Sequence, residues 1–458
     1  MQRQVPLAIT TSNKTVAGHE QLENCYAEQT QGGKYGFTIK GVAGLAKHTV
    51  LPYSTGVKAL HQALGRGFAI TSDTLYEITS SGTYINRGTV QLVGTRVIAE
   101  DNGFQLVMVD GIKGYSFDFT TNVLAEITDP AFYPAASVTT QDGYFIFERT
   151  GTRQFFITGI FAVTFDPLDI ASANGQPDNI VRVLSDHREL IIFCEDTIEF
   201  WYNSGAADFP FQRSEGSFIE RGLGARYSAT KLDDVVYFVG NDRNVYMLAG
   251  YQTREISTTP VADDLQGVNI DNCYGFAYTQ GEDKFYLLTI PSRNRTWVYN
   301  IQTGSWFIRS SNQFGRYLAN NIMRFDNKNL VGDFQAGMVY EQTTAALNDD
   351  GEPILKRFVL PTINIGRSQR SLFSFELDML TGVGQTNGDS SDPKAALRVS
   401  KDDGSTWSSS MLARIGKKGE RLTRTKWNRL GNARQFLLEV TVTADIELDV
   451  GGAWVEIS

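Results

Sequence analysis

The chain has 458 residues, 20% of them charged and 41% hydrophobic, so it is long enough for two or three domains and has the composition of a folded protein. Its 42 Lys and Arg against 51 Asp and Glu give a net charge of −9, which argues against a surface that grips nucleic acid or an anionic membrane as a whole. The 28 Phe, 19 Tyr and 6 Trp favour pleated strands over helix faces. We therefore expect an all-β protein.

The three cysteines predict no redox or metal chemistry. Cys25, Cys194 and Cys273 lie far apart and show no CxxC spacing, so we expect small buried apolar side chains, with neither a disulfide framework nor a zinc site. The first residues lack the pattern of a signal peptide, and no apolar stretch approaches the roughly 20 residues that a membrane helix needs. We expect synthesis in the cytosol and no membrane insertion.

Residues 1–55 are interpreted as an N-terminal arm. The segment KYGFTIKGVAGL, residues 34–45, is a candidate for a strand that closes a ring of repeats, because closure usually pairs strands from the two ends of such a ring. The segment VKALHQAL, residues 57–64, could form one turn of helix.

Residues 56–348 contain a recurring unit of a polar turn, an aromatic-rich strand, a second polar turn and a strand with Tyr or Trp. Each unit predicts a β-hairpin, and dipeptides such as Asn102-Gly103 and Asp142-Gly143 supply turn residues that tolerate positive φ. The spacing of 36 to 49 residues is typical of four-stranded propeller blades. The six clear units begin at Gly65, Asp101, Gln141, His187, Asp233 and Glu282, and a weaker seventh begins at Phe325. We predict a β-propeller of six or seven blades, with stacked β-sandwiches as the alternative.

The repeat is lost after a turn-rich break near residues 345–353. New alternating segments follow, so residues 349–458 are predicted to form a separate C-terminal β-sandwich. Acidic pairs such as Asp263-Asp264 and Asp349-Asp350 are interpreted as solvated turns.

One short motif in the last domain matches an Asp-box turn. In SKDDGSTW the aspartate can accept backbone N–H bonds, the glycine can adopt positive φ, and the tryptophan can pack beneath the turn. Asp boxes recur in sialidase propellers, which makes a carbohydrate-binding or sialidase-like protein the alternative function. A single copy outside the repeats favours a structural turn formed by Ser400, Asp402, Gly404, Thr406 and Trp407.

No catalytic template stands out elsewhere. The four histidines form no HExxH, and the chain has neither GxxxxGK[ST] nor GxSxG. The loop RGLGAR, residues 221–226, is a loop with flanking arginines and not a phosphate cradle. We therefore expect no enzyme, no cofactor and no metal site.

Positive charge is concentrated in residues 411–434, which hold eight Lys or Arg against one Glu. We call these eight residues the basic strip. Arg424 and Lys426 should share one face of a strand, with Trp427 on the other. The strip could contact an acidic protein face, including that of another copy, or nucleic-acid phosphates, and the lack of interleaved aromatics favours protein. Its members are Arg414, Lys417, Lys418, Arg421, Arg424, Lys426, Arg429 and Arg434.

The order and spacing of several segments resemble a known family. These are NCYAEQ from Asn24, GVAGL from Gly41, GRGF and LYEI in the first hairpin, TIEFWYNSG from Thr197, and the run from VSKDDGSTW to RQFLLEV. Together they resemble the phage stabilisation, or packaged-DNA stabilisation, proteins of short-tailed bacteriophages over nearly the full length. The Arg-rich closing motif of that family here carries Lys426, Asn428 and Asn432.

The resemblance implies a structural virion protein made in the host cytoplasm. It implies a homohexameric ring that forms the tail hub or nozzle beneath the portal and its adaptor. Such a ring retains packaged DNA, continues the channel for DNA ejection, and attaches a tail needle and fibres or tailspikes. The family's role involves no enzymatic activity.

Overall fold

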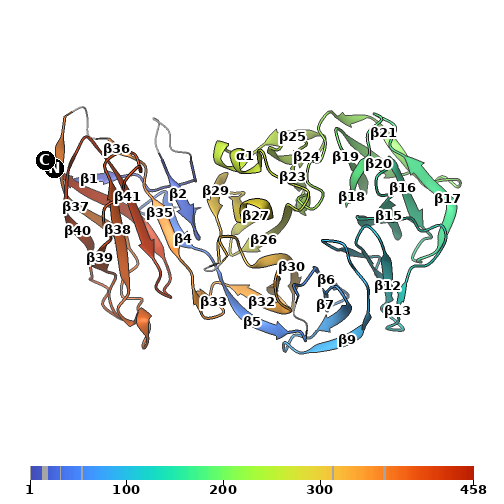
Figure 1. Cartoon of the computed structure of the whole chain (residues 1–458), viewed down its shortest axis with the longest axis horizontal. Helices are drawn as coiled ribbons and strands as arrows, with labels where there is room; N and C mark the ends of the chain where they lie inside the picture. The colour runs from blue at the N-terminus through green and yellow to red at the C-terminus, as the bar shows by residue number, and fades with distance from the viewer. Residues whose placement is uncertain (1, 13–18, 31, 53–54, 312–313, 365–367) are drawn as a thin grey trace.

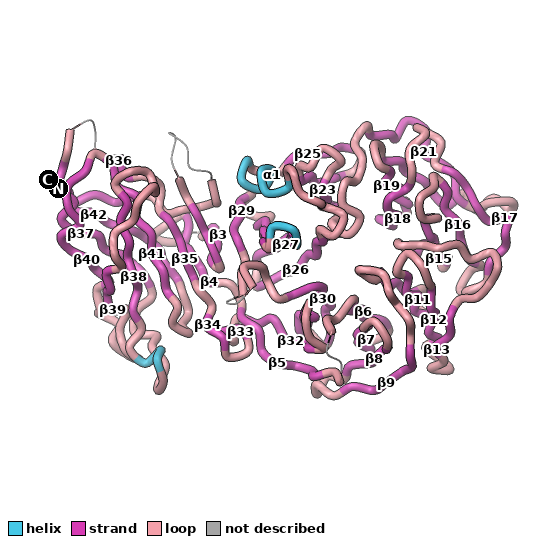
Figure 2. The backbone as a smooth tube through the Cα atoms, in the orientation of Figure 1, coloured by secondary structure: helices cyan, strands magenta, loops and turns pink. Residues whose placement is uncertain are grey.

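A computed structural model describes the chain except for residues 1, 13–18, 31, 53–54, 312–313 and 365–367. A ring of small antiparallel sheets lies beside a two-layered β-sandwich, and both chain ends lie on the sandwich (Figure 1). Strands dominate throughout, and the helical segments are short (Figure 2). The predicted all-β fold of a propeller followed by a sandwich is confirmed.

The first three blades are regular four-stranded antiparallel sheets. Their strands are β6 (Ala59–Ala63), β7 (Arg66–Ile70), β8 (Thr74–Ile78) and β9 (Tyr84–Thr89); β10 (Ile98–Asp101), β11 (Gln105–Val109), β12 (Gly114–Asp118) and β13 (Leu124–Glu126); and β14 (Val138–Gln141), β15 (Tyr144–Glu148), β16 (Gln154–Thr158) and β17 (Phe165–Ser172). The segment in which one helical turn was expected instead supplies β6, because its alternate side chains pack on both neighbouring blades.

Blades 4 and 5 follow the same plan. Their strands are β18 (Ile180–Asp186), β19 (Glu189–Cys194), β20 (Ile198–Asn203) and β21 (Phe211–Ile219), then β22 (Thr230–Leu232), β23 (Val235–Val239), β24 (Val245–Ala249) and β25 (Gln252–Glu255). Helix α1 (Thr259–Leu265) connects blade 5 to blade 6 and buries Val261 and Leu265 against the seam between them. Pro260 lies in its first turn, where a missing N–H costs no helical bond.

Blades 6 and 7 connect the ring to the rest of the molecule. Blade 6 contains β26 (Tyr274–Gln280), β27 (Asp283–Ile290), η1 (Pro291–Arg293), β28 (Arg295–Asn300) and β29 (Ser305–Ile308); blade 7 contains β30 (Ala319–Phe325), β31 (Lys328–Asp333) and β32 (Met338–Thr343). The fourth strand of blade 7 is β5 (Gly44–Val50) from the arm, which pairs with β32 and closes the ring. Only the last two residues of the expected closing segment lie in β5, and its earlier part joins the sandwich.

The seven hairpins found in the sequence are the second and third strands of the seven described blades. These strands are buried on both faces, and successive side chains enter different seams. In β15, Phe145 and Phe147 pack toward blade 2 while Ile146 packs toward blade 4. Two-sided burial explains why the strands are continuous apolar runs with little polar alternation. Burying this apolar surface stabilises the ring by roughly 25 cal/mol per Å².

Local turn chemistry fixes the hairpin register. Four first turns place two consecutive residues at positive φ, which matches the twist of adjoining strands. They are Leu64-Gly65, Asp142-Gly143, His187-Arg188 and Asp326-Asn327.

The first and third turns of each antiparallel blade lie at the same end of the blade, and we call this side of the ring the turn face. Blades are tied in succession there by contacts of Arg66 with Asn122, Phe104 with Phe161, Asn203 with Asp142, Tyr251 with Glu189, Lys284 with Asp233 and Asn329 with Thr279.

One arginine connects blades across the centre of the ring. Arg96, just before β10, donates to Asn320 Oδ1 and to the Asn320 carbonyl, both at 2.7 Å. Its guanidinium lies 3.9 Å from the ring centroid of Tyr274 in blade 6. Because blades 1 and 7 separate blade 2 from blade 6, this contact spans the propeller centre. Burial lowers the pKa of Arg96, with a further decrease from Arg316.

The sandwich combines both chain ends. One layer has the order β3 (Cys25–Gln29), β4 (Phe37–Gly41), β42 (Asp449–Ile457), β37 (Arg370–Met379) and β40 (Thr425–Ala433), with β1 (Gln2–Val5) also paired to β42. The other contains β2 (Gln21–Glu23), β35 (Lys356–Val359), β41 (Gln435–Val442), β38 (Lys394–Ser400) and β39 (Met411–Arg414), with β36 (Ile363–Asn364) on β41. The remaining elements are β33 (Asn348–Asp349), β34 (Glu352–Pro353) and η2 (Asp389–Ser391).

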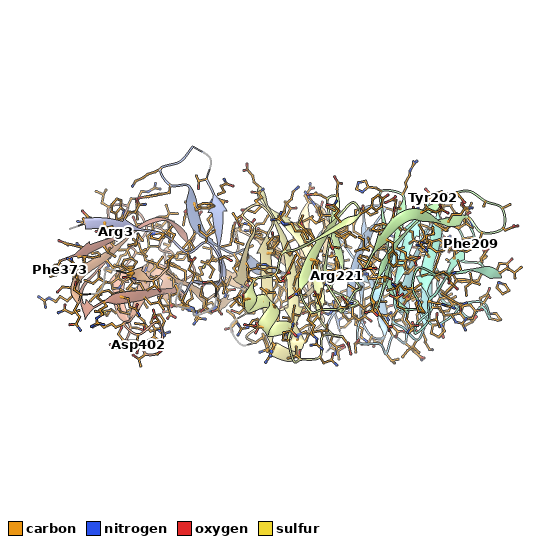
Figure 3. The ribbon with its side chains drawn as sticks, turned by 90° about the horizontal axis from the view of Figure 1, so that it is seen from above. Arg3, Tyr202, Phe209, Arg221, Phe373 and Asp402 are labelled. Carbon is orange, nitrogen blue, oxygen red and sulfur yellow. The ribbon has the colours of Figure 1, made fainter. Side chains whose placement is uncertain are left out.

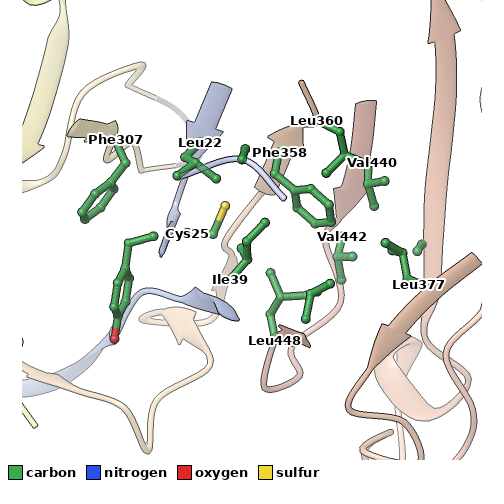
Figure 4. Packing of buried hydrophobic residues seen from close by; sticks show 14 of the residues in the cluster. Leu22, Cys25, Ile39, Phe307, Phe358, Leu360, Leu377, Val440, Val442 and Leu448 are labelled. Atoms are coloured by element: carbon green, nitrogen blue, oxygen red, sulfur yellow. The ribbon is translucent and has the colours of Figure 1, made fainter. Parts of the chain in front are cut away.

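Propeller and sandwich share one sheet and one core. Strand β2 pairs with β29 of blade 6 on one side and with β35 of the sandwich on the other. Around it, Phe307 of blade 6, Leu22 of the arm and Phe358 of the sandwich belong to a single buried cluster (Figure 4). Cys25 lies in that cluster, and Cys194 and Cys273 are buried in blade seams, as expected for small apolar residues.

Candidate assembly interface

The structure distributes the basic strip over one side of the sandwich. Arg414 ends β39, Lys417, Lys418, Arg421 and Arg424 lie in the following loop, Lys426 and Arg429 lie in β40, and Arg434 follows it. The nine residues of β40 separate Arg424 from Arg434, a span of roughly 30 Å at ~3.3 Å per residue. The strip therefore forms three groups of positive charge, at the loop after β39, along β40 and just after β40, and not one continuous patch.

Two members of the strip are already neutralised within the chain. Arg424 binds both carboxylate oxygens of Glu376, at 2.6 and 2.5 Å. Arg414 bridges Asp392 at 3.0 Å and Glu420 at 2.8 Å. Hydrogen bonding to Glu376, and then its charge, raises the pKa of Arg424. These two arginines position the loop and are not free for a partner.

Other members of the strip stay open to solvent. Lys417, Arg421, Arg429 and Arg434 are exposed and form no ion pair with any described residue, and Lys418 donates only to the Thr386 hydroxyl at 3.3 Å. Lys426 is half-buried.

Trp427 points into the sandwich, away from Lys426. It is 3% exposed and stacks on Phe375, with ring centroids 5.5 Å apart. The predicted opposite faces of Lys426 and Trp427 therefore match the structure. Its indole N–H donates to the Met411 carbonyl at 2.8 Å, and Thr425 Oγ1 donates to the Arg414 carbonyl at 3.2 Å. These bonds connect the edge strands of the two layers, and surrounding positive charge discourages further strand pairing there.

We call residues 416–424 the basic loop. Gly419 N–H donates to the Gly382 carbonyl at 3.0 Å, and Thr381 Oγ1 donates to the Arg421 carbonyl at 2.9 Å. Gly416 has φ of +106°, where an added Cβ would lie 2.6 Å from Thr423 Oγ1. Leu422 is 97% exposed beside these anchors. The loop thus presents cationic side chains and one leucine from a fixed backbone.

The Asp-box motif forms a self-contained turn between β38 and β39. Asp402 accepts from Thr406 N at 2.8 Å and from Thr406 Oγ1 at 2.6 Å, and Ser400 Oγ accepts from Gly404 N at 2.8 Å. The two bonds from Thr406, and then a bond from Ser400 Oγ at 2.8 Å, lower the pKa of Asp402 to about 2. Trp407 is half-buried and lies 5.3 Å from the Arg398 guanidinium. Figure 3 places Asp402 at the sandwich surface, far from the propeller.

An acidic cleft opens where the sandwich meets the turn face of blade 6. We call it the joint cleft; its volume is about 1040 Å³. Residues from the arm, the blade 6 turns, the linker and the sandwich line it. The charged ones are Glu28, Lys40, Glu282, Asp283, Lys356 and Glu447.

Negative charge exceeds positive charge in the joint cleft. Lys40 pairs with Glu28 at 2.6 Å. Burial, and then nearby charge from Glu28, raises the pKa of Asp283, although the Asn300 amide, which donates to it at 3.1 Å, acts in the opposite direction. Glu282 and Glu447 are exposed and pair with no described cation. The cleft therefore favours a cationic occupant.

Lys356 lies behind the cleft and is 2% exposed. Its ammonium donates to the carbonyls of Ala444 and Ile446, both at 3.2 Å. Burial lowers the pKa of Lys356 to about 8. Its ammonium group is therefore bound by these two carbonyls within the chain.

Sequence reasoning missed a buried polar network where the propeller meets the sandwich, a region that we call the joint. Arg309 donates to Asp349 at 2.9 Å and to Asn24 Oδ1 at 2.9 Å. The Asn24 amide donates to Ser310 Oγ and to the Leu355 carbonyl. Interpreting Asp349 as a solvated turn residue was wrong: it is 6% exposed and its charge is balanced by Arg309. Its sequence neighbours are polar, so no local signal identifies it.

The loop with flanking arginines is also structural. Arg226 pairs with Glu148 of blade 3, whose oxygens also accept from Ala136 N and Ser137 N. Arg221 pairs with Asp242. Across the described ranges, no group of three or more His, Cys, Asp or Glu could hold a metal ion. Nor does any helix in those ranges have the length and apolar character to cross a membrane.

Two family models match the chain over nearly its whole length. One is described as the β-propeller of bacteriophage P22 Gp10 and matches residues 19–346; the other, the β-sandwich of the same protein, matches residues 357–457. The chain belongs to the bacteriophage P22 Gp10 family. The resemblance found in the sequence is thereby confirmed. Membership makes this Gp10-family chain a structural protein of the phage tail and implies a location in the virion.

Three solved structures that are similar to the Gp10-family chain have low sequence identity to it. The designed protein Ika8 is 11% identical, with a TM-score of 0.40, over 65% of this chain and 99% of its own. BamB from Moraxella catarrhalis is 11% identical, with a TM-score of 0.39, over 75% and 98%. The extracellular domain of BT4673 from B. thetaiotaomicron is 9% identical, with a TM-score of 0.46, over 76% and 45%. No curated protein matches the chain.

Proposed function

We propose that this chain assembles into a homohexameric ring that forms the hub or nozzle of a short phage tail. In this role it retains packaged DNA, extends the channel for ejection, and attaches the adaptor below the portal, a tail needle and fibres or tailspikes. It acts through its interfaces and has no enzymatic activity. The observation that carries the proposal is the match of both the propeller and the sandwich to the P22 Gp10 family.

The architecture suits a rigid structural part. A sheet runs from blade 6 through β2 into the sandwich, so a force applied to one domain reaches the other through backbone hydrogen bonds. Arg96 spans the propeller centre, so we place the DNA channel between subunits and not through a single propeller.

We assign the open members of the basic strip to contacts with protein. Lys417, Lys418 and Arg421 form a compact cationic group beside an apolar side chain, a composition suited to an acidic protein face. A contact with DNA phosphates would instead give binding that weakens steeply with salt.

The proposal is tested by the mass and shape of the full chain, alone and in purified particles. Native mass spectrometry should give six chains of 50.8 kDa each, and electron microscopy should show a ring in the tail. A chain that is absent from particles would contradict the proposal. So would a chain present only as isolated monomers.

A further inference from the structure

The joint cleft has carboxylates that the chain leaves without cations. Glu282 lies in the first turn of blade 6, and Glu447 lies just before β42, on the opposite wall. Both are exposed, and neither forms an ion pair with a described residue. Burial raises the pKa of Asp449 beside them, and so do the charges of Glu28 and Glu447. A cationic occupant would relieve this repulsion.

The cleft also offers apolar surface and enough room for several side chains. The apolar lining residues that keep exposed surface are Val42, Ala345 and Leu347, with Ile446 and Leu448 buried behind them. A volume of about 1040 Å³ exceeds most small-molecule pockets and suits a protruding loop. The site therefore matches a segment that carries several cations and an apolar tip.

The basic loop of this chain has that composition. Lys417, Lys418 and Arg421 are open to solvent, and Leu422 is almost fully exposed. Backbone hydrogen bonds to Gly382 and Thr381 hold the loop, so ordering it on binding costs little.

The loop cannot enter the cleft of its own copy. In the sheet order, β42 and β37 lie between β4, which carries Lys40 of the cleft, and β40, which follows the loop. The hydrogen bonds to Gly382 and Thr381 that hold the loop keep it on the side of the sandwich layer where β37 and β40 lie. The occupant must therefore come from another molecule.

We propose that the joint cleft receives the basic loop of a second copy of this chain. Lys417, Lys418 and Arg421 pair with the cleft carboxylates, and Leu422 packs on its apolar lining. Because loop and cleft are different surfaces, the contact is head-to-tail and can repeat around a closed ring. This inference rests on the proposed ring and names the surfaces that join its subunits.

Engineered cysteines test the contact directly, because the three native cysteines are buried. Particles are assembled from two chains, one with Leu422→Cys and one with Ala345→Cys, and are oxidised. The expected result is a covalent dimer of this chain that requires both substitutions. Particles that contain both chains but give no dimer would overturn the inference and leave the proposed tail role intact. A cross-link from Leu422→Cys to a different virion protein would also overturn it. Absence of both chains from particles would contradict the proposed function itself.

Charge exchange provides the second test. Lys417→Glu/Lys418→Glu/Arg421→Glu in the loop should weaken self-association of the full chain about 100-fold, and so should Glu282→Lys/Glu447→Lys in the cleft. Combining all five changes should recover affinity to within about tenfold of wild type.

The matched control for the cleft is Glu215→Lys/Glu220→Lys on blade 4, which makes the same charge change on exposed residues. It should leave assembly unchanged. If the variant with all five changes assembles no better than the loop variant or the cleft variant alone, the two surfaces do not meet.

Discussion

The blades and the joint stabilise the molecule by different means. In the blades, apolar residues close in sequence pack on both faces of each strand, as Phe145 and Ile146 do. In the joint, polar residues distant in sequence meet in a buried network, where Asn24 contacts Ser310 and Arg309 contacts Asp349. A repeated scaffold thus tolerates local variation in its turns, whereas the joint depends on a few specific partners.

The largest effect should follow from breaking the network at Arg309. The change Arg309→Met leaves Asp349 buried without its cation, which should lower the free energy of unfolding by about 3–5 kcal/mol. Urea denaturation of the full chain measures it. The control Arg254→Met, on the exposed strand β25, should have little effect. Equal effects of the two changes would contradict the special role of the joint.

The joint should also show a pH dependence that comes from one buried amine, that of Lys356. The pKa of Lys356 is about 8 in the folded chain and near its ordinary 10.5 when unfolded, so unfolding takes up a proton between these values. The free energy of unfolding should rise by about 3 kcal/mol from pH 8 to pH 10.5 relative to Lys356→Met. Denaturation of both proteins across this range tests the sign. If the free energy of unfolding changed with pH in the same way for wild type and Lys356→Met, a lowered pKa of Lys356 in the folded chain would be refuted.

A single blade turn should give a smaller effect. At Gly143, φ is +88° and an added Cβ would lie 2.7 Å from the Phe161 ring, so Gly143→Ala should cost about 2 kcal/mol. At Gly65, φ is +73° with open space around it, so Gly65→Ala should cost about 1 kcal/mol. Thermal unfolding compares the two. If Gly65→Ala were the more damaging, the close approach of the Phe161 ring to Gly143 within blade 3 would not limit the side chain at this turn.

The same contrast explains what could be predicted from the sequence. The hairpins were visible because two-sided burial gives apolar runs at a regular spacing, with turn residues such as Asp142-Gly143 between them. The Asp-box turn was visible because its hydrogen bonds run among residues within six positions. Both are local.

Other features depend on contacts that spacing does not encode. Strand β5 closes the ring because it pairs with β32, almost 300 residues later, and the preceding strand β4 pairs with β42. Asp349 is buried only because Arg309 lies opposite it. The joint cleft forms from residues of the arm, blade 6, the linker and the sandwich, so its acidity was seen in the sequence only as dispersed negative charge.

The most direct test of the central claim is electron cryo-microscopy of the tail in purified particles. The account predicts a closed ring of six copies around an open channel, with the basic loop of each copy in the joint cleft of the next. A tail that lacks this chain, or holds it as separate copies without mutual contact, would contradict it.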